Sequence, residues 1–445
     1  MNINRLLIIF LLVVLTVSSC YNNKSISTPH NVLENNQLDA KIQPTLINTT
    51  KILHSQIKTL LCHKKKDPLS IPIINLNSKD ELLISFDDLD GDIKNYYYTI
   101  IHCNSDWTTS NLIESDYLYG FSKEPITEHE FSFNTMQKYT HYSFTFPTKD
   151  IQPILSGNYM IKIFEEGENE NPIAWQRFMV LENKIIIEAK VNRATLAEDR
   201  KIKHEIDFTI KNPNFPIINP YSELKVTLSQ NKREDNQITD LTPIFIKNNE
   251  LIYDYEDINT FFGNNEFRYF DIKSLRYHSE RIKNITFDST YNHVYLFNDK
   301  KRSFDRYSIT PDINGDFIIE SQEGWNSSIE ADYAFVHFTL PFDQIIYGDV
   351  FILGKFSDWQ LKKEHQMHYN TNKKQYEASI YLKQGYYNYH YALNDTIKKN
   401  IDIAYIEGTH YQTRNDYYIY VYYRNTGERY DKLIGFLKTS SKELF

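Results

Sequence analysis

The chain has 445 residues, too many for a single hydrophobic core, and this length predicts two to four domains. Aromatic residues make up 15% of it, with 34 tyrosines and 27 phenylalanines against 13 glycines, which favours strand-rich structure over helical bundles. The formal charge of −9 argues against non-specific nucleic-acid binding, because such binding needs a basic surface.

The N-terminus has the proportions of a secretory signal peptide. Arg5 follows a polar start, residues 6–17 form an apolar run, and Ser18 and Ser19 precede Cys20. A cysteine directly after two small residues resembles the lipobox of bacterial lipoproteins, which implies that residues 1–19 are removed and that Cys20 is acylated. The alternative is an ordinary signal peptide with an unrelated cysteine. An uncleaved anchor is disfavoured, because the run is shorter than the ~20 apolar residues that span a bilayer.

Residues 20–50 are rich in Asn, Ser, Thr and Lys and are predicted to form a flexible tether between the lipid and the folded part of the chain. Two further cysteines follow, Cys62 and Cys103. In an oxidising periplasm this even pair invites a disulfide. The alternative is two separate buried thiols that pack as small hydrophobes. The sequence leaves both open, since nothing in it brings the two Cα atoms within bonding range.

The first domain is predicted over residues 51–182, where short apolar segments recur at close spacing. The most prominent segment, residues 82–103, has two strand candidates around an acidic turn, with Asp90 and Gly91 at the tight point. Because glycine accepts a positive φ at no steric cost, this segment predicts a central hairpin. The regular rhythm of strands fits an immunoglobulin-like sandwich.

Two more domains are predicted, a second β-sandwich over residues 183–327 and a third over residues 328–445. In the second, strand candidates alternate with connections that are broken by Pro213, Pro216 and Pro220. Helical periodicity never extends beyond a few turns. We therefore expect an all-β chain of tandem immunoglobulin-like β-sandwich domains that follow a lipoprotein signal peptide.

The third domain carries a recognisable series of residues. A strand candidate ends in Gly354, Phe356 and Trp359, and a Tyr-rich strand candidate follows at residues 385–391. This series resembles the glycogen-binding modules of starch-acting enzymes, which are β-sandwiches. The resemblance implies that Trp359 is a sugar-stacking platform.

By the same resemblance, Tyr389 and Tyr391 are candidates for contact with a carbohydrate or a partner. The family's pattern also has a second tryptophan after the Tyr-rich strand, and residues 392–401 contain none. Packing of Trp359 in the interior is therefore the alternative to glycan binding.

Two acidic loops, residues 88–92 and 312–316, have calcium-like spacing. An EF-hand needs glycine at its sixth position, but glycine is fourth in both loops, so we interpret them as turns. His365 and His368 beside Glu364 lack a convincing third metal ligand and are predicted to be surface histidines. The sequence has no nucleophile elbow, zinc-protease motif or phosphate-binding glycine loop, so we expect no catalysis, no metal and no cofactor.

Two segments are interaction candidates. Residues 64–66 are three lysines, which also suit a solvated loop. In residues 417–423, alternation puts Tyr418, Tyr420 and Tyr422 on one face of a strand. One face of this strand must cover a core, and the other is either covered by a partner or exposed.

The first domain also resembles a known family. Its Phe-Asp-Asp-Leu-Asp turn at residues 86–90, its tyrosines at residues 96–98 and its His-Cys-Asn-x-x-Asp-Trp ending at residues 102–107 are similar to the type IX secretion system plug proteins of the Bacteroidetes. The similarity covers nearly the whole mature chain. Its further matching segments are residues 219–221, 264–271 and 385–389.

This resemblance implies a non-enzymatic plug subunit that seals the periplasmic side of the outer-membrane translocon barrel. The barrel is then the protein partner, and the N-terminal lipid contacts the membrane. In this phylum, acidic residues directly after the lipidated cysteine imply surface export; residues 21–25 contain none, which favours the periplasmic side of the outer membrane. The alternative is a glycan-binding lipoprotein that serves a nutrient-uptake system, and it depends on Trp359.

Overall fold

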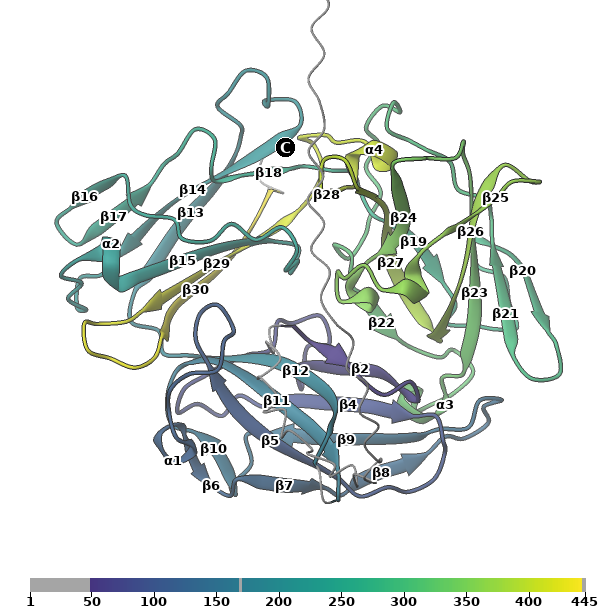
Figure 1. The fold of residues 1–445 in the computed structure, drawn as a ribbon, viewed down its shortest axis with the longest axis horizontal. Helices are drawn as coiled ribbons and strands as arrows, with labels where there is room; N and C mark the ends of the chain where they lie inside the picture. Colours follow the sequence, from purple (N-terminus) through teal and green to yellow (C-terminus); the bar gives the residue numbers. More distant parts are fainter. Residues whose placement is uncertain (1–48, 168–169, 442–445) are drawn as a thin grey trace, which may run out of the picture. The chain divides into compact units, whose positions relative to one another are not determined.

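The structure is a computed structural model and describes residues 49–167 and 170–441 (Figure 1). Residues 46–445 form one compact unit, and the fold described below is that of its described residues. Cys20 and the predicted signal peptide lie outside the described residues. The regular secondary structure of the described residues is almost entirely β-strand, which confirms the predicted fold class of tandem β-sandwiches.

Two sheets form the first body, which comprises residues 49–182. Their orders are β1-β12-β11-β5-β7, with β3 beside β12, and β2-β4-β9-β8, while β6 and β10 make a short ribbon. The strands are β1 (Lys51–Ile52), β2 (Ile57–Lys64), β3 (Ile73–Asn75), β4 (Leu82–Asp88), β5 (Tyr96–Cys103), β6 (Leu118–Gly120), β7 (Lys123–Ile126), β8 (Glu128–Phe131), β9 (Thr140–Phe146), β10 (Ile151–Pro153), β11 (Gly157–Glu165) and β12 (Pro172–Leu181).

The core of the first body follows from strict alternation along its strands. Tyr96, Tyr98 and Ile100 of β5 are buried, whereas the residues between them are half-exposed. The ring of Tyr96 packs edge-on against Phe86 of β4 at 5.3 Å and against Tyr142 of β9 at 4.9 Å. The two sheets are therefore held face to face by an aromatic layer.

The hairpin predicted for residues 82–103 is wrong. β4 pairs with β2 and β9, and β5 pairs with β11 and β7, so the acidic turn carries the chain from one sheet to the other. Both strands carry a face of large apolar side chains. Facing each other across the sandwich buries both of those faces, whereas pairing the strands in one sheet would require a second layer to cover them.

The second body combines residues 183–262 with residues 411–441. One sheet has the order β13-β14-β17-β16 with β18 beside β14, and the other has the order β15-β29-β30. The strands are β13 (Ile186–Arg193), β14 (Lys203–Lys211), β15 (Leu224–Gln230), β16 (Phe245–Lys247), β17 (Glu250–Tyr253), β18 (Thr260–Phe262), β29 (Asp416–Tyr423) and β30 (Lys432–Ser440).

The third body comprises residues 263–410. One sheet has the order β20-β21-β23-β26-β25, and in the other β27 pairs with β19, β22, β24 and β28. The strands are β19 (Arg268–Asp271), β20 (Ile282–Phe287), β21 (Asn292–Leu296), β22 (Phe317–Ile319), β23 (Tyr333–Pro341), β24 (Gly348–Leu353), β25 (His368–Asn370), β26 (Gln375–Lys383), β27 (Gly385–Asp395) and β28 (Asn400–Asp402).

The strand pairing departs from the predicted boundary after residue 327. Strands β19 to β22 precede that boundary, yet they pair with β27 and β23, which follow it. After the third body the chain returns to the second, where β29 pairs with β15 along seven residues. The second body is thus built from two stretches of the chain. The strands between β18 and β29 belong to the sheets of the third body, so among the described residues β15 finds its strand partner only in β29.

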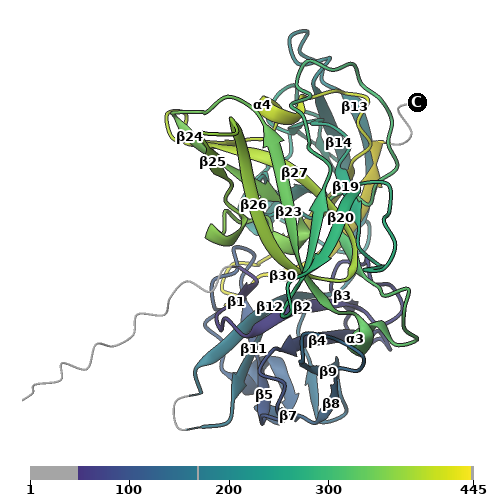
Figure 2. The same ribbon diagram turned by 90° about the vertical axis from the view of Figure 1, so that its right-hand side faces the viewer.

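The helices are single turns in the connections: α1 (Glu114–Tyr117), α2 (Pro220–Glu223), α3 (Ser327–Glu330) and α4 (Ala404–Glu407), with 3-10 turns at Lys355–Ser357 and Lys363–His365. No described helix is long and apolar enough to cross a membrane. Helix α3, in the third body, lies beside β9 of the first (Figure 2).

Candidate functional site

The buried carboxylate of Asp87 joins the first body to the third. Asp87 is the second-last residue of strand β4 and has no exposed surface. Its Oδ2 lies 2.6 Å from the Nζ of Lys383 and 2.6 Å from the hydroxyl of Tyr333, and its Oδ1 lies 2.7 Å from the Nδ1 of His141. Burial opposes ionisation, but the Lys383 ammonium and the His141 contact lower the pKa of Asp87 below its usual value. The structure therefore contains a buried ion pair between two bodies.

Further contacts surround this pair. The Lys383 Nζ also lies 4.1 Å from the centre of the Tyr139 ring, as in a cation–π contact. The carboxylate of Asp332, at the start of β23, accepts hydrogen bonds from the backbone N–H groups of Met136 (2.7 Å) and Gln137 (3.1 Å). The junction is thus polar and well satisfied, which fixes the two bodies in one arrangement.

The aromatic strand β29 joins the second body to the first. The face that carries Tyr418, Tyr420 and Tyr422 packs with Met179 of β12 in one buried cluster. The hydroxyl of Tyr422 donates a hydrogen bond of 2.9 Å to Asn158 of β11. The sequence leaves this face either to a partner or to solvent, and the structure covers it with the chain's own first body.

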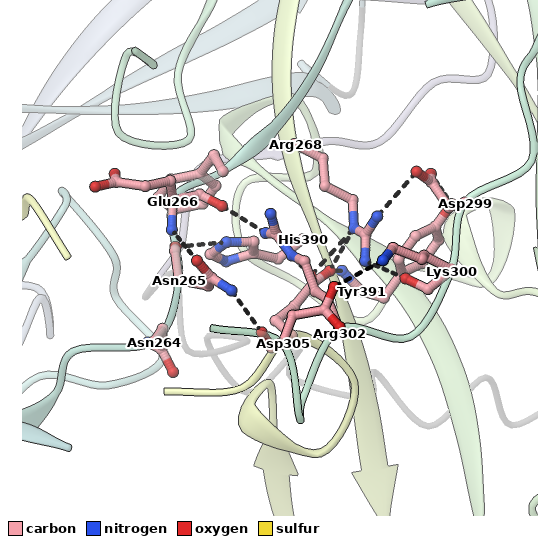
Figure 3. A network of polar contacts seen from close by, with 12 residues as sticks. Asn264, Asn265, Glu266, Arg268, Asp299, Lys300, Arg302, Asp305, His390 and Tyr391 are labelled. Carbon is pink, nitrogen blue, oxygen red and sulfur yellow. Dashed lines mark hydrogen bonds and ion pairs between the residues drawn. The ribbon is translucent and has the colours of Figure 1, made fainter. Parts of the chain in front are cut away.

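A second buried carboxylate, Glu407 in α4, lies between Arg268 and Arg302. Figure 3 shows these two arginines and the polar residues around them. Its Oε1 is 3.0 Å from the Nε of Arg268, its Oε2 is 2.6 Å from the Nε of Arg302, and the backbone N–H of Tyr391 donates to it at 2.8 Å. Arg268 also forms an ion pair with Asp299, with 2.9 Å between its Nη1 and the Oδ1 of Asp299. Burial opposes the charge, but the two guanidinium groups lower the pKa of Glu407. The sequence gives no signal of this network, because its members are scattered from β19 to α4.

The three predicted carbohydrate or partner contacts all lie in the interior. Trp359 is 3% exposed and packs at 5.9 Å against the ring of Phe267. Tyr389 and Tyr391 are fully buried, and their hydroxyls donate to Asp299 at 2.6 and 2.7 Å. Buried rings offer no stacking surface to a sugar, so these residues have the packing role that was the alternative for Trp359.

Cys62 on β2 and Cys103 at the end of β5 are free thiols in the structure. The two residues belong to different sheets of the first body. Burial raises the pKa of both thiols, that of Cys103 to about 12. The structure thus has the two separate thiols and not the disulfide.

The acidic turn between β4 and β5 brings together Asp88, Asp90 and Asp92, whose carboxylate oxygens lie within 4.8 Å of one another. The Nζ of Lys94 lies 2.8 Å from Asp88 and 3.9 Å from Asp92 and also contacts Asp90. Burial opposes the ammonium charge, but the contacts with Asp88 and Asp90 raise the pKa of Lys94. A single side-chain cation therefore links the three acids, which agrees with a turn.

The second acidic loop and the histidine pair also have structural surroundings. Asp312 accepts a 2.6 Å hydrogen bond from the backbone N–H of Phe267, and Asp316 pairs with Lys232. The predicted surface position is correct for His368, which is exposed on β25, but wrong for His365, which is 3% exposed in a 3-10 turn. The sequence around His365 is polar, so only the fold reveals its burial.

A protein family model and a solved structure both match this chain. Residues 57–182 match the family model of the Type 9 secretion system plug protein 1st domain. A solved structure of a hypothetical protein from Parabacteroides merdae is 36% identical and superposes with a TM-score of 0.86, over 88% of this chain and 99% of that chain. No curated protein matches the chain. The chain therefore belongs to one family with the Parabacteroides merdae protein, and its first body carries the first domain of the type 9 secretion system plug proteins.

Proposed function

We propose that this protein is the plug subunit of a type IX secretion system and that it seals the periplasmic side of the outer-membrane translocon barrel. The observation that carries this proposal is the match of residues 57–182 to the plug protein first domain. In this proposal the protein has no catalytic role, and Cys20 holds it at the outer membrane through a lipid. The role requires a rigid body that covers a wide pore and leaves when cargo arrives.

Rigidity between the three bodies supports this role. The ion pair of Lys383 with Asp87 links the third body to the first. The backbone N–H of Ser105, in the first body, donates to Asp431 of the second at 2.9 Å. A body whose parts could rotate against each other would leak solutes, so polar contacts that lock each junction are what a plug needs.

Reversible sealing also constrains the contact with the barrel. A plug that must leave needs a modest and polar interface, because large apolar interfaces are typical of permanent complexes. A lipid on Cys20 would keep the released plug near the membrane and so raise its local concentration at the pore. The tether then has to be long enough for the plug to move aside without diffusing away.

The test is a pull-down from the native envelope. A C-terminally tagged chain is expressed at its natural level, the envelope is solubilised in mild detergent, and the bound proteins are identified by mass spectrometry. We expect the translocon barrel at near-stoichiometric amounts. A Cys20→Ala variant is the matched control for the lipid: it should leave the outer-membrane fraction and recover less barrel. Recovery of nutrient-uptake proteins without the barrel would contradict the plug proposal and favour a glycan-uptake role.

A further inference from the structure

A cavity of about 740 Å³ lies where the three bodies meet. Ligand pockets in proteins commonly measure about 300–1,000 Å³, so a ligand of several residues fits this space. The first body contributes β2 and residues 50–55, the second contributes parts of β15 and β29, and the third contributes β22, β26 and residues 355–365 (Figure 1). Lys51, His54 and Lys363 in its wall are exposed, so the cavity opens to solvent.

The wall of this cavity is basic, although the chain as a whole is acidic. Eight lysine or arginine residues line it against four aspartate or glutamate residues, an excess of four positive charges in a chain of net charge −9. The cationic residues are Lys51, Lys58, Arg177, Lys232, Lys355, Lys362, Lys363 and Lys383, and the anionic residues are Glu234, Asp316, Asp358 and Glu364.

Part of this positive charge is not neutralised by the protein. Lys58 and Lys363 have no carboxylate within 4 Å among the described residues, unlike Lys362, which lies 2.8 Å from Asp358. The same positive charge affects His365. Burial lowers the pKa of this histidine, and the charges of Lys362 and Lys58 lower it further, to about 3. An anionic group in the cavity would be attracted by these cations.

The cavity wall also contains the free edge of a sheet. In the sheet β2-β4-β9-β8, the strand β2 pairs with β4 and with no other strand of the described residues, and its residues 57–63 line the cavity. A shift of register between Lys58 and Leu61 interrupts the pairing with β4. An edge strand leaves every second pair of backbone N–H and C=O groups without a strand partner, and an extended peptide can pair with them. Aromatic side chains line the same space and offer contact area to a ligand. These are the half-buried Trp107, Phe317, Phe335, Phe356 and Tyr381.

We propose that this cavity binds an acidic peptide segment in an extended conformation, which adds a strand to the free edge of β2. The volume suits a segment of strand length, about five or six residues. The positive charge of the wall selects acidic side chains, and the edge of β2 selects a peptide backbone over other anions. This activity is separate from pore sealing and does not depend on it.

Fluorescence anisotropy with the full chain tests the proposal. The probe is a fluorescein-labelled hexapeptide of alternating glutamate and tyrosine, and we expect saturable binding at low salt. The double variant Lys58→Glu/Lys363→Glu should weaken binding at least about tenfold, because it replaces attraction by repulsion. The matched control is Lys247→Glu/Lys283→Glu, which makes the same charge change at exposed positions outside the cavity and should leave the affinity unchanged.

Four results would overturn the proposal. The first is no saturable binding of the acidic peptide by a chain whose far-ultraviolet circular dichroism is that of the folded protein. The second is equal binding of a lysine–tyrosine hexapeptide. The third is unchanged affinity after N-methylation of every second backbone nitrogen, which removes the donors of strand pairing. Displacement of the peptide by polygalacturonate at lower concentration than by unlabelled peptide would instead identify an anionic glycan as the ligand and reject the peptide.

Discussion

Asp87 and Glu407 are both buried carboxylates in ion pairs, but their surroundings differ. Glu407 has two guanidinium partners and a backbone N–H, all from within the third body. Asp87 has one ammonium partner, and it comes from another body. The comparison shows two uses of the same chemistry: one carboxylate organises the interior of a sandwich, and the other forms the ion pair between two sandwiches.

The difference has an energetic consequence. Removing one member of a buried ion pair typically costs about 3–5 kcal/mol, because the remaining charge stays buried without compensation. At Glu407 that cost falls on the folding of the third body itself. At Asp87 it falls on the junction, so the first body and the third can respond by separating. The predictions below test this distinction.

The largest effect is expected for Glu407→Gln. This variant removes the carboxylate between the largely buried Arg268 and Arg302 and leaves only Asp299 as a carboxylate partner of Arg268, so it should lower the free energy of unfolding by about 4 kcal/mol in a urea titration. Glu377→Gln is the control, since its ion pair with Lys373 on the same body is partly exposed and should cost less than ~1 kcal/mol. Equal losses in the two variants would mean that the buried network does not hold the third body together.

Lys383→Met should cost about 3 kcal/mol and should also change the form of the transition. Because Asp87 loses its partner from the third body, calorimetry should show the first body unfolding in a separate step. Replacing both members, Asp87→Leu with Lys383→Met, should recover most of the lost stability, since no charge is then left buried alone. A single cooperative transition in Lys383→Met would contradict the role of this pair as the link between the bodies.

Acidification should lower the stability of the fold through His390, the histidine beside Glu407. Burial lowers the pKa of His390 to about 3, more than the nearby Glu407 raises it, whereas a histidine in the unfolded chain has a pKa of about 6.5. The unfolded state therefore binds more protons below pH 6.5, and stability is lost as the pH falls from there towards 3. Between pH 7 and pH 5 the contribution of His390 is about 2 kcal/mol. Urea titrations at both values should show a loss smaller by this amount in His390→Gln, and an unchanged pH dependence would contradict the prediction.

The smallest effect is expected from reductant. If Cys62 and Cys103 formed a disulfide, the first body would have a covalent cross-link between its two sheets. Because the structure holds both as free thiols, reductant should shift the melting temperature by less than about 1 °C. In urea without reductant, a thiol reagent should label both residues. Protection of both from labelling, with release by reductant, would establish the disulfide.

The strands could largely be predicted from the sequence, but their partners could not. Alternation along residues 96–100 indicates both the strand β5 and its buried face, because side chains of a strand alternate with a period of two. The same period does not say which sheet a strand joins, and this explains the wrong hairpin of β4 with β5. It also explains why the strand pairing departs from the predicted boundary after residue 327, since the pairing of β19 and β22 with β27 has no local signal.

The candidate site shows the same limit more strongly. The motif at residues 86–90 contains Asp87 and carries the family resemblance, so the sequence points to the right segment. Its partner Lys383 is 296 positions away, and nothing in either segment indicates the other. The motif around Trp359 suggests an exposed platform, but the structure buries this side chain. The sequence misleads here because burial depends on what packs over a residue and not on its neighbours in the chain.

The sequence by itself determined the β-rich fold class, the strand β5 with its buried face and the likeness of the first body to the plug proteins, since composition, alternation and short motifs are local properties. Only the tertiary structure decided which strands pair, which face of β29 is covered, that Trp359 and His365 are buried, and that Asp87 meets Lys383. These features depend on long-range contacts, where packing and charge compensation select one arrangement from many that the local pattern allows.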